Sequence, residues 1–231
     1  MTRQIPWLRV FVEGVVIVGS ILLAFGIQAW WDERQERAEE RQALQALSGD
    51  FEAADSDLEA QVLVIDSAAV AAAAILALVG PGADESYADS LAVLIPQIIR
   101  RPVFQPPMGT LEALLGSGDL RLITNDTLKA ALASFPSHLA GMTLTQGYGS
   151  EVVFSHLIPY LNTQVPMLRF GLMARGESDF TGNPAGLLRS LEFENLAQNR
   201  LMGIRFTLLA ADNMDARIAS IRQMLREELA N

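Results

Sequence analysis

Two histidines of this sequence directly follow serines, and a serine beside a histidine is a pairing used in nucleophilic catalysis. The pairs are Ser137 with His138 and Ser155 with His156. In such catalysis the imidazole must accept a hydrogen bond from the hydroxyl that it activates. Adjacent residues of a helix point about 100° apart, so neither pair can make that bond. We therefore predict no catalytic residue in either pair.

Three further motifs have structural interpretations. Gly116-Ser117-Gly118 lacks the length and the lysine of a phosphate-binding loop, so it predicts a helix-ending turn. Asn125-Asp126-Thr127 fits a glycosylation sequon but is interpreted as a helix cap. An acidic cluster lacks the spacing and the glycine of a calcium loop and is interpreted as a solvated helix face; its members are Asp50, Glu52, Asp55, Asp57 and Glu59.

The composition narrows the chemistry further. The 231 residues include no cysteine and two histidines, which removes thiolate ligands and thiol nucleophiles and disfavours a multi-histidine metal centre. We predict no cofactor and no metal. Lys and Arg number 17 against 27 Asp and Glu, so the chain lacks the basic surplus that nucleic-acid binding requires. A mean hydropathy of +0.24 indicates a folded chain with a sizeable core.

The elements that could position any site begin with an uncharged stretch near the N-terminus. No charged residue occurs from Gly14 to Trp31, and with the preceding apolar residues the segment reaches about 24 positions, enough for ~30 Å of helix. Trp7 at one end and Trp30 and Trp31 at the other are typical of membrane interfaces. We predict an N-terminal tail and transmembrane anchor at residues 1–31, and a single helical domain at residues 32–231.

A cleaved secretory signal peptide is the competing interpretation of the same stretch. Arg3 and Arg9 form a basic start, and Ala24-Phe25-Gly26 is a passable cleavage site. The tryptophans favour the retained anchor, because a discarded peptide needs no interfacial residues.

The orientation of the anchor depends on its flanking arginines. Arg3 and Arg9 precede the span, while Arg34, Arg37 and Arg41 follow it, which is nearly a tie under the positive-inside rule. The arginines after the span are interleaved with acidic residues, whereas the N-terminal tail has none before Glu13. We expect the N-terminus in the cytoplasm and the helical domain in the periplasm, with the anchor in the inner (cytoplasmic) membrane.

One face of the predicted span carries polar and small side chains. A carboxylate inside a span is costly and is a functional hypothesis by default. The alternatives for Glu13 are anchoring at the membrane edge, with headgroups or Arg9 as partners, lateral helix association, and ion or proton handling. A small-xxx-small pair on the same face favours association. The predicted membrane-helix association face comprises Glu13, Ser20, Ala24, Gln28 and Trp31.

The anchor is expected to continue as one long amphipathic helix to Val79, loosened at most around Gly49. Residues 32–48 contain no Gly or Pro and are rich in strong helix formers. Gly80-Pro81-Gly82 ends the helix. Before that end, apolar residues recur every seven positions in two rows. The first row is Leu44, Phe51, Leu58, Ile65, Ala72 and Val79. The second row is Leu47, Ala54, Ala68 and Ile75, with Gln61 as its one polar member.

The remaining segments also have helical patterns, and we expect no strands. The predicted helices run from Ser86 to Arg100 with a kink at Pro96, from a Thr110 cap to Leu115, from an Asn125 or Asp126 cap to Phe135, from Ser137 to about Leu161, and from Ser190 to Leu229. Residues 163–186 are expected to form a long loop with a short ordered piece at 167–173.

The first and last helices each present an apolar stripe that needs cover. The last helix carries Ala197, Leu201, Ile204, Leu208, Ala211, Met214, Ile218, Ile221 and Leu225 at spacings of three and four. Packing of the two stripes within one chain is favoured, because a coiled coil of two first helices would leave the last stripe exposed.

Two blocks resemble a family of bacterial single-pass membrane proteins of unknown function. In the anchor, Glu13, Ala24, Gln28 and Trp30 fall on the family's Glu...Ala...Gln-x-Trp pattern. The second block, Thr110 to Phe135, is similar to the family's short helix, small-residue turn, Leu-x-Leu-Ile and Asn-Asp-capped helix. The resemblance implies a basic cytoplasmic tail, of which this chain has a shorter version, and it implies no activity.

These observations predict an all-α, single-pass membrane protein whose anchor helix continues into an extramembrane helical bundle. The leading hypothesis is a non-enzymatic, membrane-anchored interaction or scaffold protein, with the lipid bilayer and a protein partner or a second copy as its partners. The alternative is a periplasmic helical-bundle sensor domain that binds a small ligand. A closed core with an exposed apolar patch favours the first, and a polar-lined cavity of several hundred Å³ favours the second.

Overall fold

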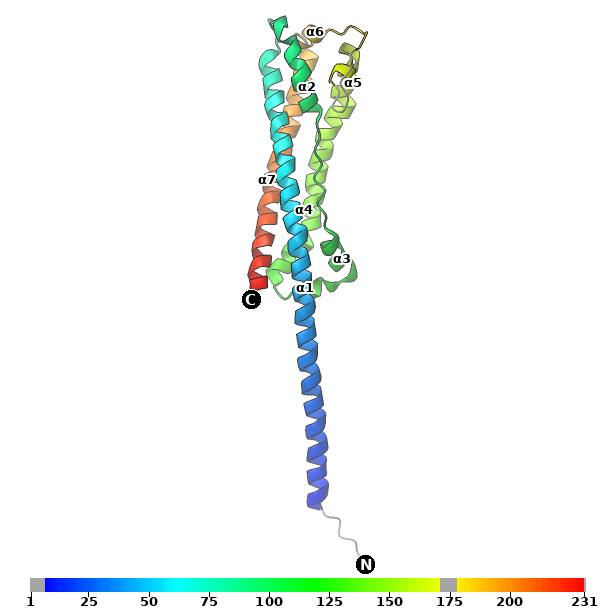
Figure 1. Cartoon of the computed structure of the whole chain (residues 1–231), viewed down its shortest axis with the longest axis vertical. Helices are drawn as coiled ribbons and strands as arrows, with labels where there is room; N and C mark the ends of the chain where they lie inside the picture. The colour runs from blue at the N-terminus through cyan, green and yellow to red at the C-terminus, as the bar shows by residue number, and fades with distance from the viewer. Residues whose placement is uncertain (1–6, 171–177, 231) are drawn as a thin grey trace, which may run out of the picture.

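The computed structural model describes residues 7–170 and 178–230, with the side chains of residues 7–10, 12, 14, 15, 169 and 170 left out. Every element within these ranges is helical, which confirms the all-α class. The longest is α1, Trp7–Leu78, a helix of 72 residues that runs through Gly49 without interruption. Its first half projects away from the rest of the chain, and the other helices lie against its second half (Figure 1).

The second long helix, α7 (Leu191–Ala230), runs back along α1 in the opposite direction (Figure 1). Two apolar clusters fill the contact between them. Toward the free end of α1, the buried residues Phe51 and Leu58 share a cluster with Met214 and Ile218 of α7. Farther along, Ile65 and Ala72 share a second cluster with Ala197 and Ile204. The two stripes therefore cover each other within one chain, as the sequence favoured.

A third long helical segment lies beside α7. It consists of α4 (Asp126–Glu151), a π-helical turn at Val152–Leu157, and α5 (Ile158–Gln164). The predicted division into two helices at residue 136 is wrong, because Pro136 lies inside α4. A proline removes one helical hydrogen bond, but the buried Phe135 and Met142 pack on both sides of it and hold the helix together.

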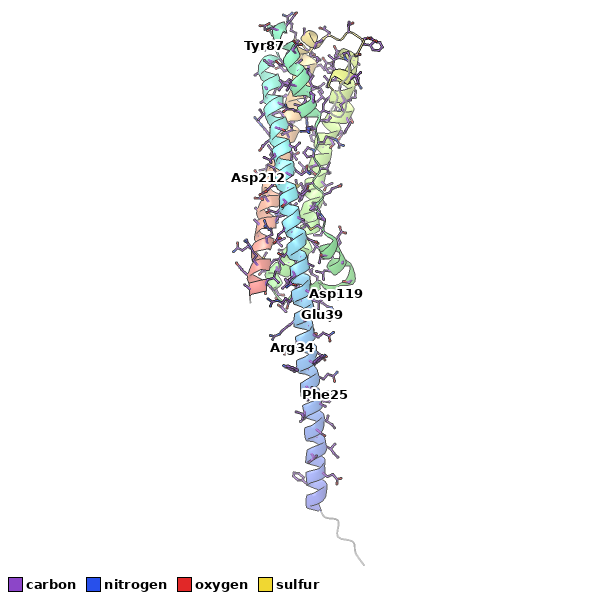
Figure 2. The ribbon with its side chains drawn as sticks, in the orientation of Figure 1. Phe25, Arg34, Glu39, Tyr87, Asp119 and Asp212 are labelled. Atoms are coloured by element: carbon purple, nitrogen blue, oxygen red, sulfur yellow. The ribbon has the colours of Figure 1, made fainter. Side chains whose placement is uncertain are left out.

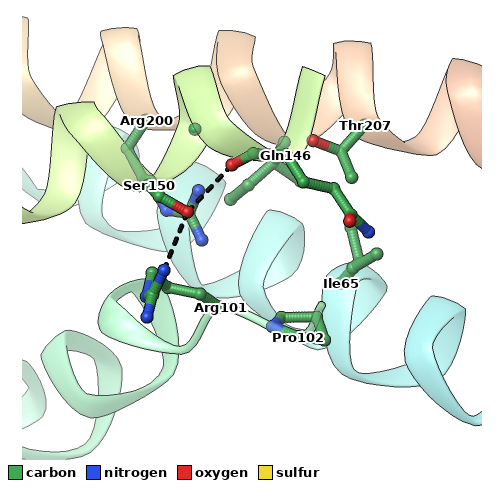
Figure 3. Close-up of a pocket in the computed structure, with 9 residues that line it drawn as sticks. Ile65, Arg101, Pro102, Gln146, Ser150, Arg200 and Thr207 are labelled. Carbon is green, nitrogen blue, oxygen red and sulfur yellow. Dashed lines mark hydrogen bonds between the residues drawn. The ribbon is translucent and has the colours of Figure 1, made fainter. Parts of the chain in front are cut away.

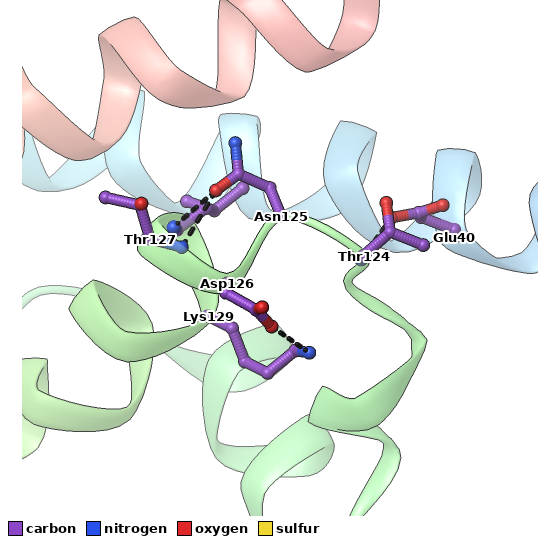
Figure 4. Close-up of polar contacts among 7 residues, drawn as sticks. Glu40, Thr124, Asn125, Asp126, Thr127 and Lys129 are labelled. Carbon is purple, nitrogen blue, oxygen red and sulfur yellow. Dashed lines mark hydrogen bonds and ion pairs between the residues drawn. The ribbon is translucent and has the colours of Figure 1, made fainter.

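The start of α4 has the cap that the sequence predicted at Asn125. The Oδ1 atom of Asn125 accepts hydrogen bonds from the backbone N–H groups of Thr127 at 2.9 Å and Leu128 at 3.0 Å (Figure 4). Its Nδ2 donates to Glu228 of α7 at 2.6 Å. The Asn-Asp-Thr motif thus caps α4 and fastens it to the last turns of α7.

The connection from α1 to α4 contains short helices. The expected helix from Ser86 begins instead as a 3₁₀ turn, η1 (Glu85–Ser90), before α2 (Leu91–Ile99), which includes Pro96. Asp84 caps η1, and Tyr87 is about half exposed rather than packed with the apolar face. This tighter turn has no buried residue, so its local cap decides its geometry.

The next helix, α3 (Gly109–Ser117), precedes a 3₁₀ turn, η2 (Asp119–Leu122). The expected Thr110 cap is wrong, since the backbone N–H of Thr110 is itself the donor, to Asp50 of α1 at 2.8 Å. Gly118 ends α3 with a φ of 79°, the left-handed conformation that favours glycine.

The predicted loop at residues 163–186 contains two short helical pieces. These are η4 (Met167–Phe170) and α6 (Pro184–Leu188), and Asn183 caps α6 through a 2.8 Å bond from the Gly186 N–H. Residues 171–173 of the expected ordered piece lie outside the described residues.

Candidate functional site

The projecting part of α1 exposes a continuous apolar surface. Its large apolar side chains described between Phe11 and Trp31 are each 50–70% exposed. The helix is long and apolar enough in this region to cross a membrane. A core helix of a water-soluble body passes the same test of length and composition, but its apolar residues would be covered. Here the rest of the described chain leaves them uncovered, as Figure 2 illustrates around Phe25.

The predicted association face lies on this projecting part. All five of its residues are exposed, and all belong to α1, so the structure places no other element against them. The hydroxyl of Ser20 donates to the carbonyl of Ile17 at 2.8 Å, which satisfies it within the helix. The side chain of Arg9, considered as a partner of Glu13, is outside the described residues. The five residues are Glu13, Ser20, Ala24, Gln28 and Trp31.

A short charged stalk joins this apolar part of α1 to the helical body. Glu33 and Arg37 form an exposed ion pair at 2.5 Å, and the guanidinium of Arg34 lies 5.7 Å from the Trp30 ring centroid. The body begins at Glu40, whose carboxylate accepts bonds from the N–H of Thr124 at 2.6 Å and its hydroxyl at 2.7 Å (Figure 4). Glu40 is nine positions after Trp31 on the same helix, so the body starts about 14 Å beyond Trp31.

An apolar groove lies on the outside of α4 and α7, and sequence reasoning missed it. Leu144 is 78% exposed and Leu209 is 60% exposed, with Tyr148 and Phe206 about half exposed beside them. The groove that these four residues line has a volume of about 490 Å³. The sequence signal was a second apolar row on α7, with Phe206 and Leu209 outside the buried stripe.

Two members of the acidic cluster on α1 contact other helices, so its interpretation as a solvated face holds only for the others. Asp50 accepts the hydrogen bond from Thr110 that starts α3. Asp55 forms an ion pair with Arg222 of α7. Asp57 accepts a bond from Gln61 at 3.2 Å, while Glu52 and Glu59 are exposed.

Neither the serine–histidine pairs nor the acidic and histidine side chains of the described residues form a catalytic or metal-binding group. Both pairs lie along the continuous helical segment from α4 to α5, and within the described chain no hydrogen bond joins either histidine to its serine. No group of three or more His, Asp or Glu side chains among the described residues is placed to hold a metal.

A buried arginine is the second feature that the sequence did not predict. Arg200 of α7 is only 5% exposed, and it donates from Nε to the carbonyl of Ile98 and from Nη2 to that of Arg100, both at 2.7 Å. Burial lowers the pKa of Arg200 to about 10, with a further contribution from the nearby positive charge of Arg101. The guanidinium therefore stays charged at neutral pH, and it joins α7 to the end of α2.

In comparisons with known proteins, no protein-family model, no curated protein and no solved structure matches the chain. The resemblance of the anchor and of residues 110–135 to a bacterial family stays a prediction.

Proposed function

We propose that this protein is a membrane-anchored, non-enzymatic interaction protein. In this proposal residues 1–31 form the tail and the transmembrane anchor, and α1, α4 and α7 form a helical bundle held close to the bilayer. The observation that carries the proposal is the uncovered apolar surface from Phe11 to Trp31, followed directly by a body with a filled core. Burying that surface in lipid is favourable at roughly 25 cal/mol per Å².

The proposed interaction surface is the α4/α7 groove around Leu144 and Leu209. An exposed apolar patch that polar residues surround marks a contact site more often than a ligand pocket. The two apolar clusters fill the contact between the long helices, so a small-ligand sensor would have to use an open surface pocket, such as the one of about 510 Å³ beside Gln164 and Thr181. The face of the span that includes Ser20 and Ala24 offers a second contact, between membrane helices.

We assign the groove to a second copy of this chain. Two copies in one membrane have the same orientation, so their grooves are held at the same height, and the shared membrane raises their effective concentration. In a twofold contact, α4 of one copy packs on α7 of the other. Gly149 of α4 lies level with Gly203 of α7, which puts the exposed Glu151 about 6 Å along the helix axis from the level of the partner's Arg205, a distance that the two side chains can span. The contact therefore pairs opposite charges beside the apolar centre.

The groove is tested by photo-crosslinking of the full chain in membranes, with the crosslinker at position 144. We expect a crosslinked dimer that the additional change Leu209→Asp removes, because a charge in an apolar contact is costly to desolvate. Both positions are exposed, so the fold is retained. The matched control is a crosslinker at Leu191, which is 70% exposed but lies outside the groove. Equal products at both positions, or a product with a different protein, would contradict the assignment.

We further propose that the helical body lies in the periplasm and the N-terminus in the cytoplasm. The support is the N-terminal tail, which carries Arg3 and Arg9 and no acidic residue before Glu13, whereas the arginines after the span are interleaved with acidic residues such as Glu33. A reporter that is active only outside the cytoplasm, fused after Asn231, is expected to be active. If that reporter is silent and a reporter that works only in the cytoplasm is active at the same position, the topology is the reverse of the one proposed.

A further inference from the structure

A small cavity lies where α4, α7 and the end of α2 meet in the middle of the body. Its volume is about 20 Å³, room for one or two water molecules or a single small ion. Figure 3 shows the guanidinium groups of Arg101 and Arg200 on one side and the side chain of Gln146 on the other. Ser150 and Thr207 complete the polar part of the wall.

The hydroxyl groups of this wall are already engaged. Ser150 accepts a bond from Nη1 of Arg101 at 2.9 Å and donates to the carbonyl of Gln146 at 2.9 Å. Thr207 donates to the carbonyl of Gly203 at 2.9 Å. The side-chain oxygen of Gln146 accepts from the N–H of Phe104 at 3.3 Å. These bonds leave N–H donors as the main groups still available to a bound species.

One buried side-chain nitrogen has no acceptor, and one guanidinium nitrogen of Arg200 makes no hydrogen bond to the described chain. Gln146 is 7% exposed, and its buried Nε2 has no hydrogen-bond partner in the described chain. Arg200 uses Nε and Nη2 for backbone carbonyls, which leaves Nη1 against Gly149 of α4. A Cβ at Gly149 would lie 3.4 Å from this nitrogen, which is an ordinary contact distance, so the guanidinium packs directly beside the glycine. A buried donor without a partner, such as Nε2 of Gln146, is destabilising, so a species that accepts from it is favoured.

The charges around the cavity are of one sign. Its lining includes two guanidinium groups and no carboxylate. The carbonyls at the end of α2 bring Arg200 a partial negative charge, roughly half an elementary charge for a complete helix end. Arg101 adds a second positive charge, and its guanidinium lies 4.4 Å from the Phe154 ring centroid. A buried cation is stable when it is paired, and the described residues that line this cavity include no anionic partner.

We infer that this cavity binds a small inorganic anion of the size of chloride, held by Arg200 and Arg101, with Gln146 as an additional donor to the anion or to a water beside it. The anion would supply the missing countercharge and join α4, α7 and the end of α2. This site is separate from the groove and from the span, and it stands whether or not the chain forms a dimer.

Thermal unfolding of the full chain in detergent tests this inference. At constant ionic strength, replacing gluconate by chloride is expected to raise Tm in a saturable way, and bromide should act like chloride. Arg101→Gln should abolish the rise without unfolding the protein, because Arg101 is exposed. Arg217→Gln, which removes an exposed arginine of α7 outside both the groove and the cavity, is the matched control and should retain it.

Crystals grown in bromide give the second measurement. The inference predicts an anomalous scattering peak within hydrogen-bond distance of Nη1 of Arg200. Water alone in the cavity, equal Tm values in chloride and gluconate, or a chloride effect that survives Arg101→Gln would each overturn it. A peak without any change in Tm would mark an adventitious ion only, and it would overturn the inference as well.

Discussion

Replacing Phe51 by aspartate is expected to unfold the helical body of this protein. Phe51 is fully buried, and its ring meets the ring of Phe135 edge to face at a centroid distance of 4.9 Å. Loss of a buried phenylalanine costs about 3–5 kcal/mol, and a buried unpaired carboxylate adds several more. The sum is comparable to the whole stability of an ordinary domain, about 5–15 kcal/mol. Far-UV circular dichroism and thermal unfolding measure the effect.

A matched control lies on the same helix. Leu63 of α1 is 72% exposed, so Leu63→Asp introduces the same charge without disturbing the core. We expect its free energy of unfolding to stay within about 0.5 kcal/mol of the unchanged protein. Equal destabilisation by the two changes would show that the apolar stripe of α1 that includes Phe51 is not packed inside the body.

The fragment that begins at Asp32 is expected to be a water-soluble, folded monomer. It retains both stripes, and in the structure each covers the other, as Leu58 and Ile218 do in a common cluster. It lacks the uncovered apolar surface of the span, and without a shared membrane the effective concentration of the groove is low. Sedimentation velocity at micromolar concentration measures its mass.

The opposite outcomes for this fragment point to particular helices. An obligate dimer that Leu58→Asp dissociates would show that α1 pairs with a second α1, against the packing described above. A weak dimer that Leu209→Asp dissociates would instead place the contact in the α4/α7 groove, because Leu209 is exposed and makes no part of the internal seam.

The regular parts of the fold could be predicted from the sequence because they follow periodic rules. The seven-residue spacing of Leu44, Phe51 and Leu58 indicates one buried side of α1, and these residues are buried in the structure. The Asn125 cap follows from a side chain that bonds the next few N–H groups, which is a local effect.

The irregular parts depend on contacts between distant segments and could not be predicted. Pro136 is a local signal for a helix end, yet the packing of its neighbours on α1 and α7 keeps α4 continuous. Leu132 and Leu144 are the same residue type on one helix, and the first is buried while the second is exposed. Which face of α4 is covered depends on α7, which begins 40 residues after α4 ends.

Among the candidate sites, the buried site around Arg200 is the clearest example of a feature that depends on distant segments. Arg200 stands within the apolar stripe of α7, between Ala197 and Leu201, where a charged residue at the period of the stripe was a usable signal. Its acceptors are carbonyls at the end of α2, about 100 residues earlier. No periodic rule brings these two segments together.

The central claim, that residues 1–31 stay attached and hold the protein in a membrane, is tested most directly by mass spectrometry of protein extracted from membranes. The account predicts an intact N-terminal peptide, including Trp7 and Trp31, in material that alkaline washing does not release. A mature protein that starts near Ile27 and is recovered in the soluble fraction would show that the segment is a cleaved signal peptide and would contradict the account.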